Sequence, residues 1–336
     1  MTVKITIIGL GQIGASLGLA LAAHKDQVTT LGHDKSPEVA RKALKLGAVE
    51  GISYNLPASI EGANIIVLAI PFDQVHETLK YIAPDLIENA VVMDTVPAKT
   101  AVAEWMKELL PAKRHYIGLT PAINPVSLEN PVTGLEAARP DLFKDGVIAI
   151  TSPQGTSEEV LKLAADFVAL LEAQPFFADQ AEVDGIMVLA HLLPGLSAAA
   201  LAETVTGQPS WSDIRKMAGK PYSFATQPLD GEDPSAMAEA IMQNRVNMTR
   251  VLDEYMATLA SLRNDIANEN KKGLITRLSR ARKGRAQWQL ERARGDWRSV
   301  EFGGQEMPKA SDFLKQQIGG LDKLFARRSR KKPEEE

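Results

Sequence analysis

The sequence predicts an α/β fold with a doubly wound parallel sheet for its N-terminal half, and an all-α fold for the residues that follow. Up to about residue 180, short runs of β-branched residues alternate with Ala- and Leu-rich segments of helical period, which is the βαβ rhythm of a parallel sheet. After the segment "QPFFADQ" (174–180) the strand signals stop and the apolar residues recur at helical spacing. A domain boundary is therefore expected near residue 180.

The individual elements follow from these two periods. Six strands are expected, at residues 3–8, 28–33, 65–70, 90–94, 115–119 and 147–151. Helices of the first half are expected at residues 12–24, 37–46, 73–83, 98–110 and 156–172, the last introduced by the capping-box pattern "TSEE". Helices of the second half are expected at residues 181–206, 210–219, 234–268, 272–296 and 309–326, with the loop "KPYSFATQPLDGEDP" between the second and third.

Length and composition exclude several classes of protein. A chain of 336 residues is long enough for two domains, and its formal net charge of -4 makes nucleic acid an unlikely partner. Without cysteine there are no disulfides or thiolate metal sites, and the five scattered His show no ligand spacing, so no metal centre is expected. The apolar run in "MTVKITIIGLGQIG" is far shorter than a signal sequence or a membrane span. We therefore expect a cytoplasmic protein with no membrane partner.

A glycine-rich loop follows the first expected strand. Gly9, Gly11 and Gly14 form a G-x-G-x-x-G pattern that opens a helix, as in Rossmann-like dinucleotide-binding folds. The first glycine allows a tight turn, the second a close approach to a pyrophosphate, and the third close packing of helix on strand. The helix N-terminus would hold the anion.

Asp34 lies twenty residues after Gly14, at the end of the next expected strand. A carboxylate there can accept both adenosine ribose hydroxyls and repels a 2′-phosphate, which favours NAD. Lys35 follows at once and could serve a phosphate, so NADP is also possible; the alternative for Asp34 is a turn residue before "KSPE". The expected cofactor contacts are Gly9, Leu10, Gly11, Gln12, Ile13, Gly14, Asp34, Lys35, and Ile70 and Pro71 at the end of "IIVLAIPF".

From residue 3 to about 265 the chain resembles the prephenate/arogenate dehydrogenase family, the oxidoreductases of tyrosine biosynthesis. The matching segments include "GLGQIGASL", "VLAIPFDQVHETL", "LLPAKRHYIGLTP" and "DPSAMAEAIMQNRVNMTRVLDEY". The resemblance implies a homodimer and an oxidative decarboxylation, in which hydride leaves C4 of a cyclohexadienyl substrate for the nicotinamide while a histidine draws the 4-hydroxyl proton. It implies a dinucleotide-binding Rossmann-like domain and a helical substrate and dimerisation domain, in agreement with the expected division into 1–180 and 181–296. Beyond residue 297 the composition is more polar, so a polar extension is expected over 297–336.

The chain departs from the family at its active-site motifs. Against the family's Gly-Gly-His-Pro-Met stretch, Thr120 stands in place of the catalytic histidine. Against Gly-Ser-Val-Lys, Pro97 replaces the serine and Lys99 is kept. Against Ser-His-Leu-Pro-His, His191 matches the serine, one place before the first histidine.

Two further family residues have no counterpart. The arginine that binds the substrate carboxylate is matched by Gln227, and the family glutamate has no match, although Glu129 is nearby. The resemblance therefore implies the family's fold and cofactor together with a rebuilt active site.

Three functions are compatible with this sequence. The first is a diverged dehydrogenase with His191 as acid/base, Lys99 as electrostatic partner or proton carrier, Thr120 and Asn124 as substrate contacts, and Lys216 or Lys220 for a carboxylate. The alternatives are a packed helical His191, a solvated Lys99, and Thr120 and Asn124 bonded to loop backbone.

The second function is an NAD(P)-dependent dehydrogenase or reductase of another small carboxylated substrate, such as a β-hydroxyacid or imine. The third is a non-catalytic NAD-binding regulatory or scaffold dimer. It is favoured by the missing acid/base residues and by the run 271–294, which holds nine Lys and Arg against one Glu. That run is also typical of a solvated helix.

Overall fold

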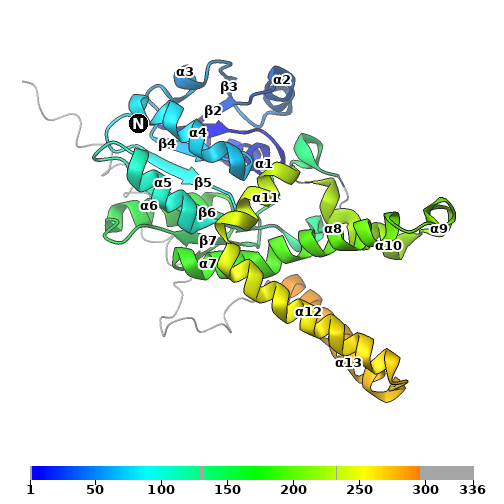
Figure 1. Cartoon of the computed structure of the whole chain (residues 1–336). Helices are drawn as coiled ribbons and strands as arrows, with labels where there is room; N and C mark the ends of the chain where they lie inside the picture. The colour runs from blue at the N-terminus through cyan, green and yellow to red at the C-terminus, as the bar shows by residue number, and fades with distance from the viewer. Residues whose placement is uncertain (1, 129–131, 232, 296–336) are drawn as a thin grey trace, which may run out of the picture. The chain divides into compact units, whose positions relative to one another are not determined.

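The computed structural model describes residues 2–128, 132–231 and 233–295, which fall into two compact units (Figure 1). The first unit holds residues 2–184 and the described part of Asp230–Ala240, and the second holds Gly185–Leu229 and residues 241–295. Glu129, the helix expected at 309–326 and the extension expected at 297–336 lie outside the described residues.

The first unit is built on one eight-stranded sheet of order β3-β2-β1-β4-β5-β6-β7-β8. The strands are β1 Val3–Ile8, β2 Val28–His33, β3 Gly51–Ile52, β4 Ile65–Leu68, β5 Val91–Asp94, β6 His115–Ala122, β7 Val147–Thr151 and β8 Gln174–Phe177. All six predicted strands are present. Two strands were not predicted: β3, which has only two residues and shows no period, and β8, which lies before the boundary expected near residue 180.

One strand pairing differs from the predicted parallel sheet. β7 runs antiparallel to β6, with Gly118 opposite Thr151, whereas every other neighbouring pair is parallel. Parallel neighbours require a long crossover, usually a helix. The described part of the β6–β7 connection holds only the short 3₁₀ turns Pro125–Ser127 and Gly134–Ala137, so β7 returns beside β6 in the opposite direction.

Side-chain caps mark only some helices of the first unit. These helices are α1 Gln12–Leu21, α2 Pro37–Leu46, α3 Leu56–Ile60, α4 Phe72–Ile82, α5 Lys99–Leu109 and α6 Glu158–Leu170, while α7 Gln180–Met187 begins in the first unit and ends in the second. In α2 the Ser36 side chain accepts a hydrogen bond from the Val39 N–H, and Gly47 ends the helix at φ 78°. The capping box predicted for α6 is not formed, because the Thr156 hydroxyl donates to the Pro153 carbonyl and the helix begins after Ser157.

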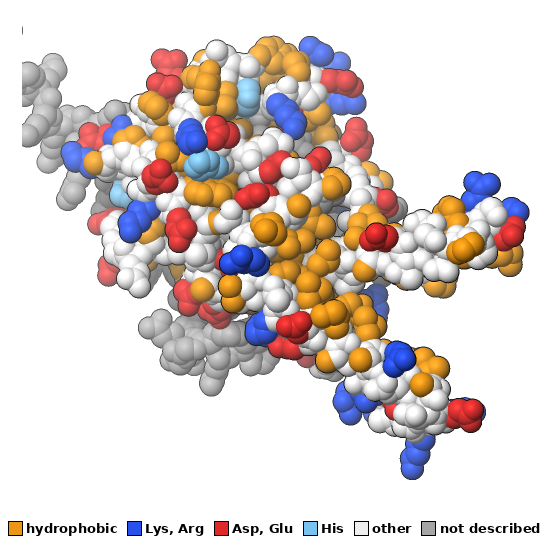
Figure 2. Space-filling model, in the orientation of Figure 1, with side chains coloured by type: hydrophobic (Ala, Val, Ile, Leu, Met, Phe, Trp, Pro, Cys, Tyr) orange, Lys and Arg blue, Asp and Glu red, His pale blue; other side chains and the backbone are white. Residues whose placement is uncertain are grey.

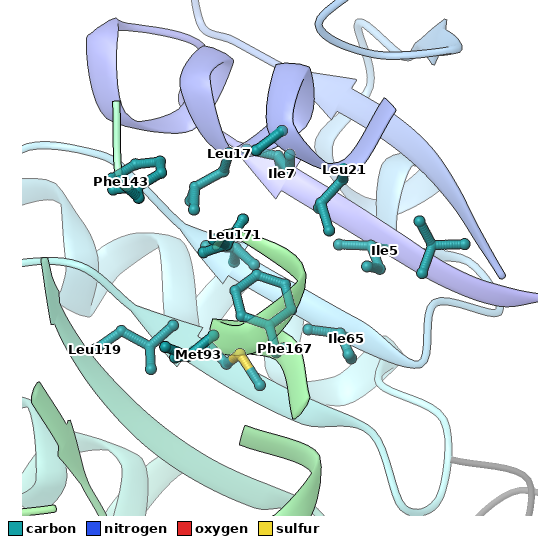
Figure 3. Close-up of a cluster of buried hydrophobic side chains, with 14 of the residues drawn as sticks. Ile5, Ile7, Leu17, Leu21, Ile65, Met93, Leu119, Phe143, Phe167 and Leu171 are labelled. Atoms are coloured by element: carbon teal, nitrogen blue, oxygen red, sulfur yellow. The ribbon is translucent and has the colours of Figure 1, made fainter. Parts of the chain in front are cut away.

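Alternate residues of the central strands point to opposite faces of the sheet, and both faces are buried. One face forms the main core, in which Leu17 and Leu21 of α1 and Phe167 of α6 lie against Ile5 and Met93 of the sheet (Figure 3). The residues of opposite phase are also buried and face α4 and α5: Ile66, Leu68 and Val92 of the sheet, with Phe72, Val75, Leu79, Val102 and Met106 of the helices. Burial on both faces explains why β4 and β5 read as uninterrupted apolar runs.

The second unit is entirely helical in its described residues. Its helices are α8 Leu193–Thr206, α9 Trp211–Met217, α10 Lys220–Thr226, α12 Arg245–Ala267 and α13 Lys271–Arg294, while α11 Pro234–Gln243 lies mostly in the first unit. The prediction of a loop at "KPYSFATQPLDGEDP" is wrong, since α10 forms there. The predicted helix 234–268 is interrupted at Asn244.

Residues Gln180–Thr206 form one continuous helical stretch of 27 residues. By length and composition alone it could cross a membrane, and 22% of its apolar window is buried. Pro194 has no N–H to give to a helical carbonyl, and the preceding turn, Val188–Leu192, is a π-helix. The same composition suits a helix that packs against protein.

Candidate active site

The glycine loop joins β1 to α1 with the geometry that its pattern predicts. Gly9 has φ +90°, and its N–H donates to the His33 carbonyl at 2.8 Å. A Cβ on Gly9 would lie 2.3 Å from the Ala69 oxygen, and one on Gly14 would lie 1.9 Å from the Gly9 oxygen. Both glycines are therefore required by the turn and by the close packing of α1 on the sheet.

Gly11 differs from its neighbours because the space in front of it is open. A Cβ built there meets no atom within 4 Å, although Gly11 is the residue before the first turn of α1. No side chain caps this helix, and its first turn, which includes Gln12 and Ile13, carries no acidic residue. An open backbone approach at a helix N-terminus fits a pyrophosphate.

Asp34 follows β2 directly and lies against the same loop. Its Oδ2 accepts a hydrogen bond from the Leu10 N–H and its Oδ1 one from the Ser36 N–H, both at 2.8 Å. Lys35 beside it is exposed. The carboxylate is thus fixed at the edge of the glycine loop; its role toward a ribose stays a prediction.

Ile70 and Pro71 leave the end of β4 beside the loop. The Ile70 side chain lies 2.8 Å from the point where a Gly9 Cβ would be, and Pro71 precedes the first turn of α4. The structure therefore brings Ile70 against the glycine loop.

Thr120 and Asn124 lie at the carboxyl end of β6, the sheet edge to which parallel β1, β4 and β5 also lead. The Thr120 hydroxyl is buried and has no hydrogen-bond partner within the described residues. The Asn124 side chain is occupied, accepting from the Val126 N–H at 2.9 Å and donating to the Asp141 carbonyl at 3.3 Å. Asn124 thus orders its loop, as the alternative proposes, whereas the Thr120 hydroxyl bonds no loop backbone among the described residues.

Lys99 is the first residue of α5 and has no exposed surface, so the alternative of a solvated lysine is wrong. Its ammonium donates to Asp94 Oδ1 at 2.5 Å and to the Leu119 carbonyl at 2.7 Å. The second oxygen of Asp94 accepts from the Tyr116 hydroxyl at 2.7 Å. We call Asp94, Lys99 and Tyr116 the buried polar cluster.

Burial governs the ionisation of this cluster. It lowers the pKa of Lys99, against the opposing attraction of the Asp94 carboxylate. It also raises the pKa of the Tyr116 hydroxyl well above its usual value, with Asp94 acting in the same direction. The two carboxylate oxygens of Asp184 accept from the N–H groups of Lys99 and Thr100 at 2.5 and 3.1 Å, and so cap α5.

His191 lies in the π-helical turn of the second unit and is exposed, while the next residue, Leu192, is completely buried. Lys216 is exposed and paired with Asp213 at 2.7 Å, Lys220 opens α10, and Gln227 begins a 3₁₀ turn. No group of three or more His, Asp or Glu in the described part of the chain could hold a metal ion.

Sequence reasoning did not select Asp94, Tyr116 or Asp184. Asp94 carried a signal, because an acidic residue ends an otherwise apolar buried strand. In the sequence Tyr116 looks like an ordinary strand residue and Asp184 like an ordinary helix residue. Only their hydrogen bonds, from Tyr116 to Asp94 and from the Lys99 N–H to Asp184, show that they belong to this site.

Two family models match the chain. Residues 17–176 match the prephenate dehydrogenase nucleotide-binding domain, and residues 179–280 match the prephenate dehydrogenase dimerization domain. The first match begins after the glycine loop, so the assignment of the loop rests on its own geometry.

Curated relatives and solved structures agree with these models. The chain is 25% identical to cyclohexadienyl dehydrogenase of Zymomonas mobilis over 84% of its length and 94% of the relative's. It is 22% identical to prephenate dehydrogenase of Bacillus subtilis, covering 81% of this chain and 72% of that one. The fold matches Aquifex aeolicus prephenate dehydrogenase with a TM-score of 0.73 at 20% identity, over 85% of this chain and 98% of that one. For Synechocystis arogenate dehydrogenase the TM-score is 0.66 at 23% identity, over 85% and 99%. The chain therefore belongs to the prephenate dehydrogenase family, with the nucleotide-binding and dimerization domains of that family.

Proposed function

We propose that this chain is an NAD-dependent dehydrogenase that oxidises a carboxylated cyclohexadienyl compound, prephenate or arogenate, in a rebuilt active site. The proposal is supported by the names of its relatives, and by the Aquifex aeolicus enzyme, which was solved with hydroxyphenyl propionate and NAD+. Bound NAD would supply the acceptor for the hydride. The chain's own residues must then bind the cofactor, orient the substrate and move one proton.

The glycine loop and Asp34 carry the cofactor part of the proposal. The open space at Gly11 and the uncapped N-terminus of α1 suit a pyrophosphate. The Asp34 carboxylate can accept hydrogen bonds from ribose hydroxyls, which favours NAD over NADP. Lys35 is exposed beside it and is the residue through which NADP could still bind.

The observation that carries the substrate part is the orphaned hydroxyl of Thr120. A buried hydroxyl without a partner costs free energy, and such groups in native proteins call for a ligand, a water or a functional reason. Thr120 stands at the strand end where the family keeps its base, so its hydroxyl is placed to bond a substrate hydroxyl or carbonyl. It cannot itself take a proton near neutral pH.

His191 is the residue that we assign to proton transfer. Of the other four histidines, His24 ends the 3₁₀ turn after α1, His33 bonds the Ser53 carbonyl, His76 packs on Trp105, and His115 starts β6 at the sheet edge opposite Thr120. The π-helical turn at His191 also supports the assignment, because such turns are frequent at functional sites. Lys216 and Lys220 are the candidates for the substrate carboxylate.

Replacement of Thr120 by valine tests the substrate contact. Thr120→Val removes the orphaned hydroxyl at constant shape, so the protein should unfold at a higher temperature while kcat/KM for prephenate or arogenate falls about tenfold. Thr151→Val is the matched control, because the Thr151 hydroxyl is also buried and without a partner among the described residues, while the residue as a whole is only 1% exposed against 9% for Thr120. It should raise stability and leave kcat/KM unchanged. An unchanged kcat/KM in Thr120→Val would remove Thr120 from the site.

We further propose that the chain works as a homodimer in the cytoplasm, with a small molecule as its substrate. Residues 179–280 match a dimerization domain, and this region includes the apolar helical stretch Gln180–Thr206. Hydrophobic side chains gather over α12 in the view of Figure 2. Val246, Met256 and Leu259 of this helix are exposed. Such a surface suits a second copy of the chain.

A further inference from the structure

Lys99 is a buried cation whose hydrogen-bonding capacity is fully used. An ammonium has three donors, and here they reach Asp94 Oδ1, the Leu119 carbonyl, and the Asp94 carbonyl at 3.3 Å. Both oxygens of the Asp94 carboxylate are also engaged, since Oδ1 accepts from Lys99 and the Val96 N–H and Oδ2 accepts from the Tyr116 hydroxyl. The cluster is therefore a complete network with no donor left for a substrate.

Gly118 makes room for this network. It lies opposite Asp94 in the β5–β6 pairing, and a Cβ on it would meet Lys99 Cδ and the Tyr116 hydroxyl oxygen, each at 2.9 Å. The Lys99 side chain thus occupies the space that a side chain at position 118 would take. From there it reaches the carbonyl of the next residue, Leu119.

The contact with Leu119 completes the sheet where β5 ends. The β5–β6 register stops at Asp94 opposite Gly118, so β5 offers no strand partner to the Leu119 carbonyl. Lys99 supplies the missing donor. On its other side β6 continues to pair with β7, Leu119 opposite Ile150 and Thr120 opposite Ala149. The ammonium therefore links Asp94 of β5 to Leu119, the residue before Thr120.

A buried ion pair is a costly way to obtain stability alone, because apolar residues of the same volume often serve as well. It does fix polar groups in one geometry. We infer that Lys99 is a positioning residue: held by Asp94 and Tyr116, it anchors the Leu119 carbonyl and so fixes the end of β6 that carries Thr120. The effect on catalysis rests on the proposed function; the ordering of β6 does not.

The double variant Lys99→Met with Asp94→Asn tests this inference. It removes both charges of the pair together, so neither Lys99 nor Asp94 is left as an unpaired ion, while the Asp184 carboxylate keeps its hydrogen bonds from the N–H groups at the start of α5. Hydrogen exchange of the folded protein should be about two- to tenfold faster at the amides of residues 119–122, which are those of Leu119, Thr120 and Ala122 because Pro121 has no N–H. This is the loss expected for one hydrogen bond, and exchange in β1 should be unchanged. In turnover assays kcat should fall by a similar factor while the Kd for NAD stays the same.

Lys113→Met with Glu88→Gln is the matched control. This pair also joins a lysine to a carboxylate, at 2.7 Å, but it is exposed and lies before the start of β6. Its removal should leave the exchange of residues 119–122 unchanged. If the first double variant does not fold, Lys99→Gln gives the same comparison, because its shorter amide cannot reach Asp94 and Leu119 together.

Wild-type exchange at 119–122 in a folded Lys99 variant would overturn the inference, and so would exchange that rises equally in β1. These outcomes are separate from the proposed function. A protein that binds NAD but oxidises no substrate would refute the proposed function and leave the exchange result standing.

Discussion

Replacing Gly11 by alanine should abolish tight NAD binding without harming the fold. The backbone at Gly11 has φ −72° and ψ −160°, which alanine adopts easily, and the added Cβ meets no protein atom within 4 Å. The free energy of unfolding should therefore change by less than about 1 kcal/mol. The added methyl lies where the pyrophosphate must approach, and losing one hydrogen bond to a charged group costs about 1.5–3 kcal/mol, or roughly ten- to 150-fold in Kd.

Gly14→Ala is the matched variant with the opposite expectation. Its Cβ would lie 1.9 Å from the Gly9 oxygen and 3.1 Å from the Ala69 Cβ, so α1 must move away from the loop. Overpacking of this kind costs about 1–3 kcal/mol, and each kcal/mol lowers Tm by roughly 2–4 °C in a domain of this size. Calorimetric titration with NAD and thermal unfolding measure both variants. Wild-type NAD affinity in Gly11→Ala would refute the assignment of the loop, and unfolding of Gly11→Ala would refute the open space in front of it.

Three further predictions concern single side chains. Asp34→Ala should raise the Kd for NAD more than that for NADP, and equal weakening of both would count against the ribose role. In His191→Asn the turnover should drop, which steady-state rates will show; intact turnover would remove His191 from the mechanism. The Tyr116 pKa is raised in the fold above the unfolded value of about 10, so its contribution to stability is present below pH 10 and is lost as the pH rises further. In absorbance titrations below the unfolding transition, Tyr116→Phe should remove almost none of the tyrosinate signal, and a loss of about one fifth, its share among the five tyrosines, would contradict the burial effect.

The sequence predicted the first unit well because its periodic signals and its packing agree. The apolar runs of β4 and β5 are buried on both faces, so composition alone locates them. The antiparallel β7 could not be predicted, because strand direction depends on the connection after β6 rather than on β7 itself. The family and the fold class predicted from the motifs are confirmed.

The candidate site was predictable only where a backbone requirement marks the sequence. Gly9 and Gly14 are fixed by steric contacts that leave a glycine pattern, whereas Lys99 opens a helix and therefore resembles a solvated residue. Its burial depends on Asp94, at the end of β5, and on the missing side chain at Gly118 of β6. No helical or strand period links these two positions to Lys99. The orphaned hydroxyl of Thr120 is likewise a property of the packed strand end and not of its sequence.

The central claim is that this protein, despite its rebuilt site, transfers hydride from a cyclohexadienyl carboxylate to NAD. The direct test is the formation of NADH at 340 nm by the purified full-length protein with prephenate and with arogenate, after NAD binding has been measured by calorimetry. The account predicts steady NADH formation with at least one of the two substrates, lowered about tenfold in kcat/KM by Thr120→Val. Measurable NAD binding with no reduction of NAD by either substrate would contradict it.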